Sequence, residues 1–185
     1  MKKLILALVA LIFVGCASSS SVLKLPQNAS ISNTAAPKKT LYIASIDDKR
    51  ENITIAGTIR DGSGNVAEYV MLDQNLADWF KSALANELRR NNIGVSDDYT
   101  AADATLDIAI TKFDSNLQGY AEDNLKGEAE VFYTIKEGKT TYTKRVSQTQ
   151  SEFKVLKNAE SFDPFVPNLL KDVIAKSASV IAQTL

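Results

Sequence analysis

The chain has 185 residues, of which 45% are hydrophobic and 23% are charged, and these proportions are typical of a globular protein. Its 21 basic and 22 acidic residues give a formal net charge of −1, which argues against a nucleic-acid-binding protein, because such proteins need a basic surface to displace counterions from phosphate. There is no histidine and only one cysteine, so the commonest general base, the commonest metal ligand and an internal disulfide are all excluded.

The first fifteen residues have the pattern of a signal peptide. Lys2 and Lys3 precede an apolar run over residues 4–14. That run is too short for a permanent transmembrane helix, which needs roughly 20 apolar residues, but it suits a cleaved export signal. Residues 1–15 are therefore predicted to be removed from the mature protein.

The sequence FVGC at residues 13–16 resembles the lipobox of bacterial prolipoproteins, with Phe13 where leucine is most frequent. The resemblance implies cleavage between Gly15 and Cys16 and a diacylglycerol on the Cys16 sulfur, which usually also gains an acyl chain on its amine. Two or more fatty chains hold a protein stably on a membrane, since each buried methylene contributes about 0.8 kcal/mol. Ala17, in place of an aspartate, implies by the same resemblance the outer membrane, with the protein facing the periplasm.

Residues 17–39 are rich in Ser, Asn, Thr, Ala and Pro, which predicts a flexible tether. Such a segment has a root-mean-square span of roughly 25 Å and a taut limit of roughly 80 Å. Within it, the sequence VLKL at residues 22–25 is compatible with a short edge strand. The predicted organisation is a signal peptide (1–15), a lipidated cysteine with its tether (16–39) and one folded periplasmic domain (40–185).

A strand and a hairpin open the predicted domain. Residues 40–46 (TLYIASI) have the composition of a strand, and the charged run DDKR at residues 47–50 bounds it. Residues 53–59 and 66–72 are predicted to pair as a hairpin, because the turn DGSGN between them contains Gly and Asn, which tolerate the positive φ angles of a tight reversal.

A helix is predicted over residues 73–92. Asp73 can accept hydrogen bonds as its N-cap, and Arg89 and Arg90 suit the negative end of the helix dipole before the stop NNIG. Apolar residues recur at three- and four-residue spacing and form one stripe: Leu76, Trp79, Phe80, Ala83, Leu84 and Leu88.

Three further strands and a second helix follow. Residues 105–111 and 128–135 alternate apolar and polar side chains, and residues 140–153 are rich in β-branched residues. The last helix is predicted to begin between Asp163 and Pro167, since proline is best accepted in the first turn. The expected fold is α+β: a two-layer sandwich in which two amphipathic helices cover a mostly antiparallel sheet of about four strands, with a possible additional edge hairpin.

The chain resembles the YajG family of small bacterial envelope lipoproteins. The resemblance rests on the cysteine at the end of the leader, the LPQ stretch at residues 25–27, the hairpin that leads into the first helix, the strand at residues 106–110 and the terminal helix. It implies an envelope lipoprotein with a compact α+β domain, and it implies little about molecular function.

The sequence contains no pattern that predicts catalysis, a metal or a cofactor. The turn at residues 61–65 begins like a calcium loop but has Val66 and Leu72 where an EF-hand needs glycine and glutamate. There is neither a P-loop nor a G-x-S-x-G elbow. Four carboxylates lie close in sequence, in a polar loop and the strand after it, and are interpreted as solvated: Asp97, Asp98, Asp103 and Asp107. Glu128 and Glu130 are interpreted as the wet face of their strand.

Three aromatic residues are candidates for a partner surface: Tyr120, Phe132 and Tyr142. Phe132 is predicted to point to the outer face of the sheet, where an exposed aromatic side chain often marks a binding site. Cover by the tether or by a loop is the alternative explanation.

The function predicted from these patterns is a non-catalytic accessory module that binds an envelope protein complex while it is held on membrane lipid through Cys16. Two alternatives stay open. One is a carrier or receptor for a lipid or another amphiphile, which requires an apolar pocket between sheet and helices. The other is an enzyme that uses carboxylates alone.

Overall fold

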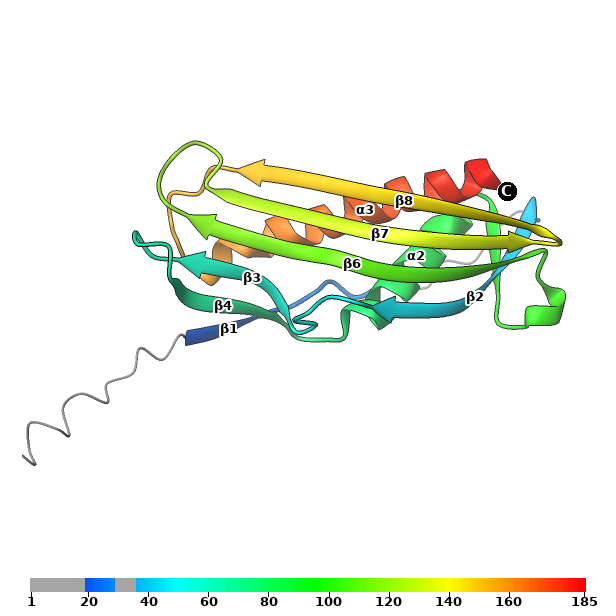
Figure 1. Cartoon of the computed structure of the whole chain (residues 1–185), viewed down its shortest axis with the longest axis horizontal. Helices are drawn as coiled ribbons and strands as arrows, with labels where there is room; N and C mark the ends of the chain where they lie inside the picture. The colour runs from blue at the N-terminus through cyan, green and yellow to red at the C-terminus, as the bar shows by residue number, and fades with distance from the viewer. Residues whose placement is uncertain (1–18, 29–35) are drawn as a thin grey trace, which may run out of the picture.

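The computed structural model describes residues 19–28 and 36–185. Within these residues, one mixed eight-stranded sheet carries two helices on one of its faces (Figure 1). The fold is thus α+β with two helices, as the sequence predicts. The predicted signal peptide, its cleavage site at Gly15 and the lipidation site at Cys16 lie outside the described residues.

The strands and helices alternate along the chain in short groups. The strands are β1 (Ser19–Leu23), β2 (Lys39–Asp48), β3 (Ile55–Arg60), β4 (Val66–Leu72), β5 (Ile93–Ser96), β6 (Ala104–Gln118), β7 (Leu125–Glu137) and β8 (Thr140–Glu152). The α-helices are α2 (Leu76–Arg90) and α3 (Phe162–Thr184), and two single 3-10 turns are η2 (Tyr99–Ala101) and η3 (Ala159–Ser161).

The long strand β6 organises the sheet. One edge of β6 pairs antiparallel with β7 from end to end, and β7 pairs with β8. The other edge is divided: β2 pairs with its first half and β3 with its last residues, both in parallel. Beyond β2 lies β5, and beyond β3 lie β4 and then β1, so the sheet forks on this side (Figure 1).

The prediction of a mostly antiparallel sheet of about four strands is wrong. The sheet has eight strands, and four of its pairings are parallel: β1 with β4, β2 with β5, β2 with β6 and β3 with β6. Two strands that pair in parallel can lie far apart in the sequence, as Lys39 and Ile93 do. No short turn joins such strands, so the sequence gives no local sign that they pair. Ile93 and Gly94, interpreted as part of the stop that follows the helix, begin the strand β5.

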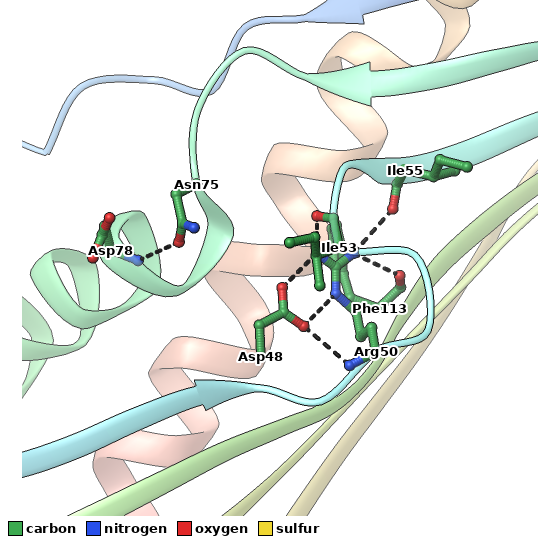
Figure 2. Close-up of polar contacts among 7 residues, drawn as sticks. All are labelled: Asp48, Arg50, Ile53, Ile55, Asn75, Asp78 and Phe113. Atoms are coloured by element: carbon green, nitrogen blue, oxygen red, sulfur yellow. Dashed lines mark hydrogen bonds and ion pairs between the residues drawn. The ribbon is translucent and has the colours of Figure 1, made fainter.

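A buried arginine fills the fork of the sheet. Between the last β2 pairing and the first β3 pairing, the β6 edge has no strand beside it. Arg50, 9% exposed, lies there and forms a bidentate ion pair with Asp48 (2.8 and 2.7 Å). Its remaining N–H groups donate to the carbonyl oxygens of Ile53, Ile55 and Phe113 (Figure 2). One guanidinium group thereby satisfies three carbonyl groups, two from the chain that leads into β3 and one from β6.

Helix α2 begins later than the sequence predicts, because a different residue caps it. The side chain of Asn75 accepts a hydrogen bond from the backbone N–H of Asp78 at 3.1 Å (Figure 2). The Asp73 carboxylate, the predicted cap, accepts instead from the backbone N–H of Leu25 at 3.1 Å. Asp73 therefore ties the segment after β1 to the start of α2.

Helix α3 begins at Phe162 and carries Pro167 in its second turn, beyond the first turn where proline was expected. Its aromatic side chains lie flat against the sheet where two glycines leave room. A Cβ on Gly57 would lie 2.5 Å from Phe162 Cε1, and one on Gly127 would lie 2.6 Å from Phe165 Cε1. Such distances are too short for real atoms, so the glycines permit the close contact of helix and sheet.

We expect Arg50→Met to lower the free energy of unfolding by about 3–5 kcal/mol, because it leaves the buried Asp48 carboxylate without its partner. Urea unfolding monitored by circular dichroism measures the loss. The control is Arg90→Met, which removes an exposed pair with Glu87 and is expected to cost less than about 1 kcal/mol. Equal effects of the two substitutions would contradict a structural role for Arg50.

Candidate functional site

The chain enters the sheet immediately after the predicted lipidation site. Ser19, three residues after Cys16, already pairs with Glu68 in β4, and Leu23 and Leu25 are buried. Residues 19–28, expected to be part of the tether, therefore belong to the folded domain. The edge strand expected at residues 22–25 exists but spans Ser19–Leu23.

The segment after β1 crosses α2 and is held there. Trp79 donates its indole N–H to the carbonyl oxygen of Pro26 at 2.7 Å, and the Asn28 amide donates to the carbonyl oxygen of Trp79 at 3.0 Å. Trp79 is buried, as its place in the predicted stripe implied. The aromatic side chain thus fixes the N-terminal segment to the helical layer.

The three predicted partner aromatics lie apart. Phe132 is half-buried on the outer face of the sheet, beside Arg145 of β8. Tyr142 lies on the opposite, helix-covered face and packs against the core. Tyr120 lies in the β6–β7 loop with 72% of its surface exposed. The structure therefore does not bring them into one surface.

Tyr120 instead belongs to a group of exposed apolar side chains that the sequence did not reveal. Phe153, Val155 and Leu156 follow β8 and are 53%, 70% and 67% exposed. We call Tyr120, Phe153, Val155 and Leu156 the apolar end. No periodicity marks such residues in a loop, and Phe153 had been included in the preceding strand.

Asn124 holds the two loops of the apolar end together. This buried side chain accepts from the backbone N–H of Lys154 at 2.7 Å and donates to the carbonyl oxygens of Gly119 and Lys154 at 3.0 and 2.8 Å. In addition, the Lys157 ammonium lies 4.0 Å from the centre of the Tyr120 ring, a cation–π contact. The apolar end is therefore one ordered surface, in which the two loops are held together.

The outer face of the sheet carries ion pairs across neighbouring strands. Glu128 pairs with Lys112 and Glu130 with Arg145, which confirms the predicted wet face. Hydrogen bonds from Thr111 and Arg145 lower the pKa of Glu130. This face is charged and internally neutralised, with the half-buried Phe132 beside Glu130 and Arg145.

A groove of about 490 Å³ lies between α2 and α3 on the outside of the helical layer. Its lining combines apolar and charged side chains, among them Trp79, Arg90, Pro167, Lys171 and Ile174. The space between sheet and helices, where the sequence analysis placed a possible ligand pocket, is occupied by fully buried side chains that include Phe80, Tyr133, Phe162 and Phe165. The groove therefore lies outside the helical layer and not between the sheet and the helices.

Three of the four clustered carboxylates, those of Asp98, Asp103 and Asp107, have separate structural contacts, whereas Asp97 lines a shallow hollow beside α2. The Asp98 carboxylate accepts from the backbone N–H and the hydroxyl of Thr100, which lower its pKa. Asp103 accepts from the backbone N–H of Thr40, and Asp107 pairs with Lys136, whose hydrogen bond lowers the Asp107 pKa. These contacts position a loop and link strands.

The segment that begins like a calcium loop is a hairpin turn between β3 and β4. The Asp61 carboxylate accepts from the backbone N–H groups of Ser63 and Asn65, and Gly64 has a φ of 88°. Across the described part of the chain, no three carboxylate or thiol groups come together as a metal site would require. Neither described helix, α2 or α3, combines the length and hydropathy of a membrane-spanning helix.

The architecture is that of a class of α+β proteins already represented among solved structures. A Xanthomonas campestris protein described under the DUF330 family has a TM-score of 0.59 at 14% identity, over 89% of this chain and 97% of its own. An uncharacterized protein has a TM-score of 0.57 at 11% identity, over 91% of this chain and 99% of its own. Identities this low show a shared fold alone.

Solved structures that are less similar include a minor lipoprotein from Acinetobacter baumannii, with a TM-score of 0.46 at 12% identity over 79% of this chain and 94% of its own. At the level of sequence, no protein-family model and no curated protein matches this chain.

Proposed function

We propose that this protein is a lipoprotein anchored in a membrane of the bacterial envelope through acylated Cys16, and that its domain is a non-catalytic accessory module for an envelope protein complex. The observation that carries the proposal is the FVGC sequence, which places the only cysteine of the chain directly after an export signal. The sheet begins at Ser19, so the folded domain starts three residues after the proposed anchor.

The residue after the cysteine is the basis for proposing which of the two membranes holds the protein. Ala17 stands where an aspartate would favour retention in the inner membrane, so we place the protein on the outer membrane, facing the periplasm. Membership of the YajG family likewise stays a prediction, which rests on the resemblance of the sequence.

A binding role for the domain is supported by its surfaces rather than by a reactive centre. The clustered carboxylates and the hairpin turn have structural contacts, while the charged outer face and the α2–α3 groove are accessible. The outer face contains Phe132 among ion pairs, an arrangement in which an aromatic anchor is surrounded by a polar rim.

A second candidate function is the binding of a lipid or another amphiphile in the α2–α3 groove. The groove has the volume of a small-molecule site and places the apolar surfaces of Trp79, Pro167 and Ile174 near the cation of Lys171, while Arg90 in the same lining is paired with Glu87. That combination suits a ligand with an apolar body and an anionic head.

The anchor is tested by metabolic labelling with radioactive palmitate. The wild-type chain should take up label and should mature by loss of residues 1–15, and Cys16→Ser should take up none, because the acyl chain needs the sulfur. Ala17→Asp is the matched control: it should keep the label and move the protein toward the inner-membrane fraction. Equal labelling of wild type and Cys16→Ser would refute the proposal.

The accessory role is tested by photo-cross-linking in cells. A photoreactive amino acid in place of Phe132 should give a discrete adduct with an envelope protein, and one in place of Lys139, in the β7–β8 turn, serves as the comparison at an exposed site remote from that face. Absence of any discrete adduct from the outer face and from Lys171 in the groove would count against a binding module.

The amphiphile hypothesis can be tested through Trp79, which lines the groove and is the only tryptophan in the chain. If a lysophospholipid binds there, the Trp79 emission should shift at sub-micellar concentration. Lys171→Glu should raise the apparent dissociation constant for an anionic amphiphile about tenfold, since it replaces attraction by repulsion. An unchanged emission spectrum over the full titration would eliminate this alternative.

A further inference from the structure

The covalent chain limits how far the domain can stand from its anchor. Three peptide units join Cys16 to Ser19, and an extended chain of that length spans at most about 11 Å. Ser19 is already paired in the sheet. If Cys16 is acylated, as the proposed function requires, the start of β1 lies beside the membrane rather than at the end of a long tether.

The start of β1 and the apolar end lie at the same end of the sheet. Cross-strand register places six residues in one row from β1 to β8: Ser19, Glu68, Ile59, Leu117, Leu125 and Glu152. Five strand spacings make this row roughly 24 Å wide. The β6–β7 loop and the chain after β8 project beyond the row, at the end where β1 begins (Figure 1).

The chain after β8 returns toward β1. η3 contacts β1, and Ser21, Val22 and Leu23 line a hollow together with Ala159 and Glu160. The lipidated terminus and the apolar end are thus joined by a short, folded path along one end of the molecule.

We propose that the apolar end inserts into the headgroup–acyl boundary of the same membrane that holds Cys16. The protein then has two attachments, the fatty chains next to β1 and the apolar end next to β8, and the row between them lies along the membrane surface. Two attachments at opposite sides of the row prevent rotation about the anchor. The strands consequently point away from the bilayer.

The chemistry of the apolar end fits a phospholipid surface. Tyr120 combines an aromatic body with a polar tip, which is the combination that favours the membrane interface. Basic and acidic residues nearly balance around it: Lys126, Lys154 and Lys157 against Glu122, Asp123, Glu152 and Glu160. Insertion therefore does not depend on anionic lipid, and zwitterionic phosphatidylcholine suffices.

The distance limit selects the membrane over other occupants. A protein partner or a second copy would have to enter between the membrane and a row of residues whose β1 end is held within about 11 Å of the anchor. The bilayer is already there. It needs no specific complementarity, and the loops are pre-ordered by Asn124, so little conformational freedom is lost on insertion.

The test uses the full mature lipoprotein, acylated in cells and reconstituted into phosphatidylcholine vesicles. Because Cys16 carries lipid, Val155→Cys provides the only free thiol for an environment-sensitive dye. Lys139→Cys, in the β7–β8 turn at the opposite end of the sheet, is the matched control. Lipids with brominated acyl chains should quench the Val155 dye at least about twofold, since it lies at the acyl boundary, and leave the Lys139 dye unquenched.

The outcomes separate the orientation from the anchor. If brominated lipid quenches the two dyes to the same extent, and the protein still floats with the vesicles, the insertion is overturned while the anchor stands. Protection of the Val155 dye from aqueous iodide without quenching by brominated lipid identifies a protein or a second copy as the occupant, and also overturns it. Failure of the wild-type protein to incorporate palmitate and to float refutes the anchor and the orientation together.

A second variant tests whether the side chains themselves hold the end in place. In a protein labelled at Tyr120→Cys, the double substitution Val155→Asp and Leu156→Asp should reduce quenching by brominated lipid at least about twofold, because carboxylates do not enter the acyl boundary. Both residues are exposed, so the circular dichroism spectrum should be unchanged. Undiminished quenching would contradict insertion through these residues.

Discussion

One buried guanidinium group allows the sheet to fork. β6 is longer than either strand on its divided edge, and the carbonyl groups between β2 and β3 would otherwise face an interior without partners. Arg50 donates N–H groups to the carbonyl oxygens of Ile53, Ile55 and Phe113, and Asp48 neutralises its charge. The planar fork of arginine suits this task, since a lysine could not reach several acceptors in fixed directions. The arrangement of β3, β4 and β1, and with it the entry point of the chain, follows from this junction.

The fork also determines which surfaces remain free. It sends β1 to the extreme edge of the sheet, at the end that carries the β6–β7 loop and the chain after β8. In the proposed attachment, the start of β1 and the apolar end share the side of the molecule that faces the membrane, while the charged outer face and the α2–α3 groove stay accessible. A protein held in this way would present the same face to every partner, which is useful for an accessory module that binds a membrane complex.

Local patterns in the sequence predicted the elements, and long-range pairing decided the architecture. The β3–β4 hairpin and the stripe of α2 were visible because turn residues and helical spacing act over a few positions. The parallel partners of β2 were not, since Ile93 and Ala104 carry no sign of where they pair. Likewise, Arg50 stands in the charged run DDKR, and composition cannot distinguish a buried ion pair from a solvated turn. The apolar end was not predicted, because the exposure of a side chain depends on the folded structure.

The order in which the chain is synthesised has a consequence for β1. It emerges first, yet its partner lies far behind it: the Ser21 hydroxyl donates to the Glu68 carboxylate, a contact between residues separated by 47 positions. Among the described strands β1 pairs with β4 alone, so its backbone stays unpaired until the β3–β4 hairpin has been synthesised and has folded. Closure of the sheet at β1 therefore comes after formation of the β3–β4 hairpin, an order that the topology alone imposes.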